Sequence, residues 1–359
     1  MKRASLIAVV VGLLAVPLPG ARAQTLPDDM LRASQLGTAQ RATLRQYVRD
    51  RLALLNSGDA QNVSAARREL MEPFRRESVR AGVVFRLAMS DALGGEMAQL
   101  IQGDDDLVAA NTLFIAGALA TGDGLAALNL GLSDPRPSVR YAAASGFATL
   151  IATLASGDDA LTDKQGGEAI ANLEEALTAE PDPIVVDGLV IAFMRSMESP
   201  DPAMQFDALT RMCRSIAAQT KRRRPQIDDD AVLFERALTR ALSAVRRPFL
   251  RLAENLDDQF TKQAAIMSGQ ALTFALARMD AGQQSLAQDE RDRLDAFSKA
   301  AETVLIIADA ELNQRNDDAI LPSDGGVPRT LLQRAASHWT GPNGILTRAP
   351  YNVSTDQFK

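Results

Sequence analysis

Residues 131–148 read GLSDPRPSVRYAAASGFA, and this stretch decides the expected fold. Its prolines form a turn, and the alanine-rich segment after the turn is typical of a helix that packs closely against others. A similar turn follows 46 residues later, because Glu180–Val185 repeats the pattern acid-Pro-x-Pro-x-Val of Asp134–Val139. A period of this length is typical of stacked helical hairpins.

The rest of the chain continues this pattern. Apolar residues recur at steps of three and four from about residue 33 to residue 320, and turns with Gly or Pro separate the segments. Hydrophobic residues make up 46% of the chain but aromatic residues only 4%, so alanine and leucine form most of the core. We therefore expect an all-α fold in which stacked antiparallel helical hairpins form an irregular α-solenoid. Pro73 and Pro248 should kink or end the helices that contain them.

The repeated turn also resembles a known family. In HEAT and armadillo-like repeats an Asp-Pro turn is followed by Val-Arg and then by an alanine pair, and the matching residues here are Asp134-Pro135, Val139-Arg140 and Ala142-Ala143. The second copy keeps Pro183 and Val185, but it has Val186 in place of the arginine and Gly188-Leu189 in place of the alanine pair. The resemblance implies a right-handed superhelix that binds partners rather than catalysing a reaction. It assigns no functional residues, because the shared positions are structural.

The first residues have the pattern of an export signal. Met1-Lys2-Arg3 is positively charged, Leu6–Leu18 is apolar, and Ala21-Arg22-Ala23 resembles a cleavage site before Gln24. The apolar run is shorter than the roughly 20 residues of a membrane span; a buried N-terminal helix is the alternative. We expect a periplasmic or extracellular protein without a transmembrane segment in the mature chain, where cleavage changes the net charge from −6 to −9.

Changes in composition divide the chain into five parts. They are a signal peptide at 1–23, N-terminal helical repeats at 24–198 with the clearest motifs at 107–197, a helix with a charged loop at 199–230, C-terminal helical repeats at 231–320, and a linker, short helix and irregular tail at 321–359. Because the end units of a solenoid need caps, the N-terminal helix and residues 328–340 are candidate caps. The charged loop is expected at Lys221–Asp230.

Few residues that could carry out chemistry are present. His338 is the only histidine, which excludes histidine-based zinc sites, and we expect it to cap the last helical layer. Cys213 is the only cysteine, so no intramolecular disulfide can form, and its apolar neighbours favour a buried side chain over a reactive thiol. The glycine motifs for phosphate and dinucleotide binding are absent from the sequence. We therefore expect no catalytic residue, cofactor or metal site, with a hydrolase that uses paired carboxylates as a minor alternative.

One segment is strongly basic. Arg211–Arg251 contains ten arginines and one lysine against four acids, a net charge of +7 in an acidic chain. At 100° per residue, Arg236, Arg240, Arg247 and Arg251 lie within about 60° of one another, opposite an apolar face. This stripe is either a solvated face that pairs with acids on neighbouring helices or a docking site for an anionic partner. Nucleic acid is a poor candidate for that partner, because the chain is expected to be exported and is acidic overall.

These features lead to two hypotheses of function. The first is an exported, non-enzymatic scaffold or protein-binding α-solenoid of the cell envelope, whose partner is another protein. The alternative is an anion-binding module that engages a polyanionic envelope component through Arg236, Arg240, Arg247 and Arg251. Binding through these side chains should weaken steeply as the salt concentration rises.

Overall fold

The computed structural model describes residues 25–227, 230–251, 256–282, 286–315 and 317–358. The expected signal peptide, residues 1–23, lies outside these ranges, as do Asp228 and Asp229 of the charged loop. Within the ranges the regular structure is helical, apart from one isolated bridge between Thr121 and Ala160. The all-α fold class is thus confirmed. The helices are α1 (Asp28–Arg32), α2 (Thr38–Leu55), α3 (Ala60–Arg75), α4 (Val83–Leu93), α5 (Glu96–Gln102), α6 (Asp106–Leu119), α7 (Gly122–Leu132), α8 (Pro137–Ser156), α9 (Asp163–Ala179), α10 (Pro183–Met194), α11 (Pro202–Arg223), α12 (Ala231–Arg251), α13 (Asp258–Gly282), α14 (Gln288–Asn313) and α15 (Arg329–Thr340), with short 3₁₀ helices at Arg195–Glu198, Ile345–Thr347 and Thr355–Gln357.

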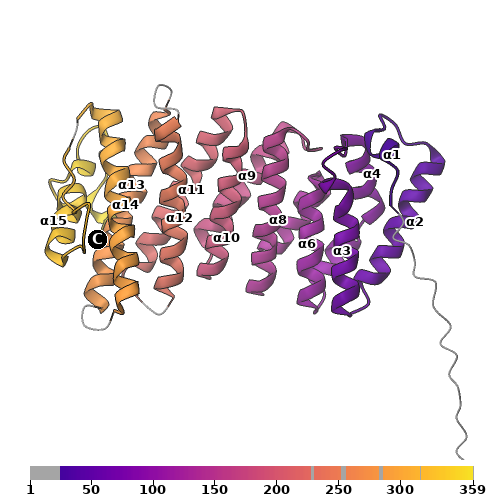
Figure 1. The fold of residues 1–359 in the computed structure, drawn as a ribbon, viewed down its shortest axis with the longest axis horizontal. Helices are drawn as coiled ribbons and strands as arrows, with labels where there is room; N and C mark the ends of the chain where they lie inside the picture. The colour runs from indigo at the N-terminus through magenta and orange to yellow at the C-terminus, as the bar shows by residue number, and fades with distance from the viewer. Residues whose placement is uncertain (1–24, 228–229, 252–255, 283–285, 316, 359) are drawn as a thin grey trace, which may run out of the picture.

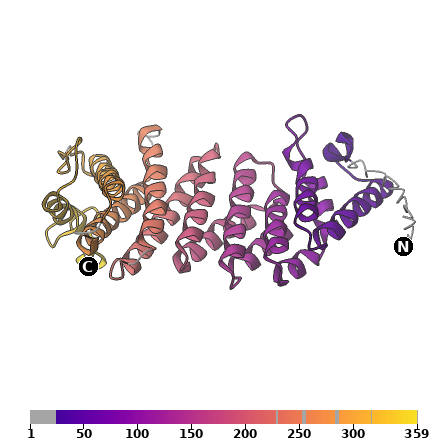
Figure 2. The ribbon, with the colours of Figure 1, turned by 60° about the horizontal axis from the view of Figure 1, so that its bottom comes forward.

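The helices from α6 onward stack in two layers along the long axis of the molecule (Figure 1). The first-helix layer consists of α7, α9, α11 and α13, and each of these helices packs on the next. The second-helix layer consists of α6, α8, α10, α12 and α14, and α3 extends it beyond α6. Figure 2 shows the same row of helices after a turn about the long axis. This is the arrangement of HEAT and armadillo-like solenoids, so the resemblance seen in the sequence is confirmed for the fold.

The Asp-Pro turns start the second helices in the way the sequence predicts. Pro137 and Pro183 occupy the first turn of α8 and α10, where a missing N–H costs no hydrogen bond. Asp182 caps α10, because its carboxylate accepts hydrogen bonds from two backbone N–H groups of the first turn. Asp134 has a different role: its carboxylate accepts hydrogen bonds from Arg136, which lowers the pKa of Asp134.

Side chains connect neighbouring hairpins along the edge that carries these turns. Arg136 donates to two carbonyl oxygens at the C-terminal end of α5, over 2.7 and 2.8 Å. Arg140 donates two hydrogen bonds to the carboxylate of Glu180 in the next turn, both 2.9 Å long. Gln219 of α11 donates to carbonyl oxygens at the end of α9. Carbonyl groups that a helix leaves unpaired at its C-terminus are therefore satisfied by the neighbouring hairpin.

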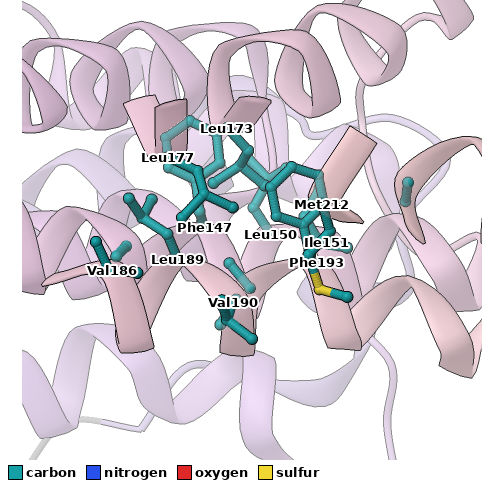
Figure 3. Packing of buried hydrophobic residues seen from close by; sticks show 14 of the residues in the cluster. Phe147, Leu150, Ile151, Leu173, Leu177, Val186, Leu189, Val190, Phe193 and Met212 are labelled. Atoms are coloured by element: carbon teal, nitrogen blue, oxygen red, sulfur yellow. The ribbon is translucent and has the colours of Figure 1, made fainter. Parts of the chain in front are cut away.

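The hydrophobic core runs without a break between the two layers. Figure 3 shows its centre, where Phe147 of α8, Leu173 of α9, Phe193 of α10 and Met212 of α11 meet, all of them fully buried. Cys213 follows Met212 and is also fully buried, as the sequence predicts. Burial raises the pKa of the Cys213 thiol, so this side chain stays protonated and behaves as a small apolar group.

Some local expectations differ from the structure. The sequence predicts that Pro73 and Pro248 kink or end their helices; they lie inside α3 and α12 and do not end them, and the kink stays a prediction. α11 continues to Arg223, so the first part of the expected loop Lys221–Asp230 is helical. Arg222 and Arg223 donate to the carbonyl oxygens of Glu180 and Pro181 after α9, which holds this last turn in place.

The irregular tail expected after residue 340 is packed against the helices. Leu346, Tyr351 and Phe358 are buried, although only short 3₁₀ helices form there. Gln270 of α13 donates a hydrogen bond to the backbone of Gln357, and α15 packs on α13. Residues 328–340, expected to form a cap, therefore lie against α13 together with the tail. The apolar residues of the tail have no helical period, so the sequence pattern does not predict their burial.

We predict that the contact between α6 and α8 tolerates no side chain at Gly117. A Cβ atom there would overlap the carbonyl oxygen of Gly146. Gly117→Ala should push the two helices apart and lower the free energy of unfolding by about 1–3 kcal/mol, measured by urea denaturation. Gly167→Ala in α9 is the matched control, because Gly167 has open space around it and alanine should stabilise the helix by about 0.5–1 kcal/mol. Equal stability of Gly117→Ala and wild type would contradict this packing.

We also predict that the Arg140–Glu180 pair stabilises the junction between two hairpins. The Arg140 side chain is 13% exposed and that of Glu180 is 5% exposed. Arg140→Ala leaves a buried carboxylate without its partner, which should cost about 3–5 kcal/mol in thermal or chemical denaturation. Arg195→Ala removes the exposed pair with Glu198 and should change stability by less than about 0.5 kcal/mol. Losses of equal size in the two variants would show that burial of the pair has no effect.

Candidate functional site

The predicted arginine stripe lies on one continuous helix, α12. Arg236, Arg247 and Arg251 are exposed, and Arg240 is half-buried. The opposite side of the helix is buried, because apolar residues recur there every three or four positions. The buried residues of this side are Phe234, Leu238, Leu242, Val245 and Phe249.

Arg240 is bound to the neighbouring helix of the same layer, α10. Its Nε donates to Oδ1 of Asp187 over 2.7 Å, and its Nη2 donates to Oδ2 over 3.2 Å. Hydrogen bonding to Asp187 raises the pKa of Arg240, so the guanidinium group stays charged. Arg236, Arg247 and Arg251 have no ion pair within the part of the chain that the structure describes. The structure therefore pairs one of the four arginines with a neighbouring acid and leaves the other three in solvent.

Several other arginines of the basic segment have structural partners. Arg211 and Arg214 of α11 both bind the carboxylate of Glu174 in α9, over 2.7 and 2.8 Å. Arg222 and Arg223 bind the carbonyl oxygens of Glu180 and Pro181, which follow α9. These contacts join α9 to α11 within the first-helix layer. The net charge of the segment thus overstates the positive charge that a partner could reach, and most of the accessible charge is on α12.

Two exposed hydrophobic residues lie near Arg240, and the sequence reasoning did not find them. Tyr141 of α8 is 40% exposed, and Ile184 of α10 is 52% exposed. The ring of Tyr141 lies against Gly188, where an added Cβ atom would be 3.2 Å from two ring carbons. The sequence carries no signal for either residue, because their helices are apolar on nearly all sides.

The single histidine is at the far end of the solenoid. The side chain of His338 on α15 is half-exposed, with its Nε2 atom 3.9 Å from Oδ2 of Asp317. Its ring meets the ring of Trp339 edge-on at 5.3 Å, which is consistent with a place in the last helical layer. Across the described ranges, no three His, Cys, Asp or Glu side chains come together in a way that could hold a metal ion.

A cleft of about 850 Å³ lies between α14 and residues 325–329. Two of its polar side chains bind the backbone of the expected linker. Lys299 donates to the carbonyl oxygen of Gly325 over 2.7 Å, and Asp295 accepts from the N–H of Val327 over 3.0 Å. These side chains hold the linker against α14, which accounts for their position without a ligand.

α12 also carries a buried acid that the sequence reasoning missed. Glu235 is 7% exposed, and Arg278, Glu290 and Arg293 line the same small pocket between α12, α13 and α14. Burial raises the pKa of Glu235 to about 7, although Arg278 and Arg293 act in the opposite direction. The spacing of Glu235 from Leu238 and Leu242 could have indicated its burial, because the three share one side of the helix.

No protein-family model and no curated protein matches this sequence. Among solved structures, the chain is similar to an engineered protein at 17% identity and a TM-score of 0.38, over 72% of this chain and 97% of that chain. It is also similar to a designed armadillo repeat protein at 15% identity and a TM-score of 0.35, over 72% of this chain and 99% of that chain. A second engineered protein matches at 16% identity and a TM-score of 0.32, over 73% of this chain and 98% of that chain.

We predict that Glu235 makes the protein less stable as the pH rises. Its pKa is about 7 in the folded chain, against an ordinary value of 4.5. Between these values the folded chain binds more protons than the unfolded chain, so the free energy of unfolding falls with increasing pH. Glu235→Gln stays neutral, and its melting temperature relative to wild type should therefore be higher at pH 8 than at pH 5. Glu311→Gln, at an exposed position of α14, is the control. A difference from wild type that is the same at both pH values would contradict the prediction.

Proposed function

We propose that this chain is a non-enzymatic, protein-binding α-solenoid whose partner is another protein. The observation that supports this proposal is the solvent-facing part of the second-helix layer, where exposed Tyr141 and Ile184 lie near the Asp187–Arg240 pair. Tyrosine and arginine are among the residues on which binding at protein interfaces depends most. A row of stacked hairpins also offers an extended surface on which a partner can make many contacts.

We propose further that the protein acts in the cell envelope or outside the cell. The support is the order of charge, apolar run and small residues in positions 1–23 of the sequence. None of the helices that the structure describes is both long enough and apolar enough to cross a membrane.

The second candidate function is an anion-binding module that engages a polyanionic envelope component. A specific observation favours it: Arg236, Arg247 and Arg251 are exposed on α12, and Arg240 lies between them along the helix. A polymer of negative charges could contact all four, whereas a compact anion could reach only one or two. Binding of this kind releases counterions and therefore depends strongly on salt.

The experiment is an affinity pull-down from an envelope extract of the cells that produce the protein. The baits are the mature wild type and a variant with Arg236→Gln, Arg240→Gln, Arg247→Gln and Arg251→Gln, each at low and moderate salt. A stoichiometric protein partner that remains at moderate salt is the expected result and supports the scaffold. An anionic polymer that binds wild type at low salt, and is lost from the variant, supports the anion-binding module instead.

A matched control separates the stripe from positive charge in general. Arg214→Gln and Arg211→Gln remove two arginines of α11 that bind Glu174 in the first-helix layer. This double variant should retain the partner under all conditions. If the wild type captures neither a stoichiometric protein nor an anionic polymer, both proposed functions are wrong.

A further inference from the structure

The outer surface of α8, α10 and α12 has a charge opposite to that of the whole chain. These three helices contain only two acids, Asp187 and the buried Glu235. Against them stand five arginines that reach this surface, all on α12, and the chain as a whole has a net charge of −6. They are Arg236, Arg240, Arg246, Arg247 and Arg251, whereas Arg140 of α8 is 13% exposed and paired with Glu180. Asp187 is therefore the one carboxylate of these helices that a partner on this surface would meet.

The register of the helices brings apolar and basic side chains to the same place. α10 and α12 are the second helices of consecutive hairpins, and their N-terminal ends lie together, since Pro181 and Ala231 line one cleft. Asp187 binds Arg240, so these two residues lie side by side. The residues one turn earlier in each helix, about 5 Å closer to its N-terminal end, are therefore also level with each other. These residues are Ile184 and Arg236.

Tyr141 extends this surface onto α8. Its ring lies against the backbone of α10 at Gly188, directly after Asp187, because glycine leaves room for it there. Tyr141, Ile184, Asp187, Arg236 and Arg240 thus form one surface across three helices, which we call the Tyr141–Arg240 face. The face combines two exposed apolar side chains with two arginines, one of them without an ion-pair partner among the described residues.

We infer that the Tyr141–Arg240 face binds a segment of another protein that carries an apolar side chain next to carboxylates. This inference rests on the proposed protein-binding function and specifies the chemistry of the partner. The apolar side chain would cover Tyr141 and Ile184, and the carboxylates would bind Arg236 and Arg240. A partner without carboxylates would leave Arg236 without charge compensation as it loses water, and a partner without the apolar group would leave the two hydrophobic residues exposed.

Asp187 has a particular part in this arrangement. Its carboxylate occupies the Nε–Nη2 edge of the guanidinium group, which is one of the two edges through which Arg240 can bind a carboxylate of the partner. Asp187 therefore competes with the partner for Arg240 and also selects against weakly acidic segments. Removing its charge should strengthen binding of an acidic segment, whereas removing the charge of Arg240 should weaken it.

The test measures binding of labelled synthetic peptides to the full mature chain by fluorescence anisotropy. The first peptide contains Leu and Phe next to several Glu residues, the second has Gln in place of each Glu, and the third is polyglutamate. The first should bind best. Ile184→Ser and Arg236→Gln should each weaken its binding about tenfold, a typical loss for a central interface residue. Asp187→Asn should strengthen it several-fold.

Leu87→Ser and Arg45→Gln are the controls, because both residues are exposed to a similar degree on α4 and α2, away from this face. Neither should change binding. Binding of polyglutamate that equals binding of the first peptide, with no effect of Ile184→Ser, would overturn the inference and favour the anion-binding module. Absence of binding by all three peptides would also overturn it. In that case a stoichiometric partner in the pull-down would show that the proposed function still holds.

Discussion

The helices of the second layer are enclosed on three sides, and the other features of the molecule depend on this constraint. α8, for example, lies between α6 and α10 and rests on α7. Only every third or fourth residue of such a helix reaches solvent, and along α10 these positions are Ile184, Asp187, Ile191 and Met194. The remaining positions must hold side chains that fit between neighbours, which accounts for the alanine-rich sequence and for the direct contact between Gly117 and Gly146. A binding surface on this layer can therefore be built only from a narrow row of residues on each of several helices.

Much of the fold could be predicted from local sequence. The prolines of the repeated turn restrict the backbone, and helix caps such as Asp182 act within a few residues, so a short stretch specifies where α8 and α10 begin. The burial of Cys213 follows from its apolar neighbours for the same reason. The tail from residue 341 onward was not predicted to pack, because its contacts with α13, such as the one between Gln270 and Gln357, join parts of the chain that are distant in sequence.

The candidate site could be predicted only in part, and the reason is again one of distance along the chain. The helical period places Arg236, Arg240, Arg247 and Arg251 on one side of α12, and the structure has them there. The partner of Arg240 is Asp187, 53 residues earlier, and it depends on how two hairpins stack. Tyr141 and Ile184 lie on helices that are apolar on nearly all sides, so hydrophobic periodicity could not indicate which of their residues stay exposed.

The connection of hairpins through nearest neighbours also has a mechanical consequence. Each helix of a layer packs on the helix before it and the helix after it, as α10 does between α8 and α12. Bending at one junction therefore leaves the packing at distant junctions unchanged, and small rotations add up along the array. At the α6–α8 junction the backbones at Gly117 and Gly146 touch, which leaves little room for such rotation.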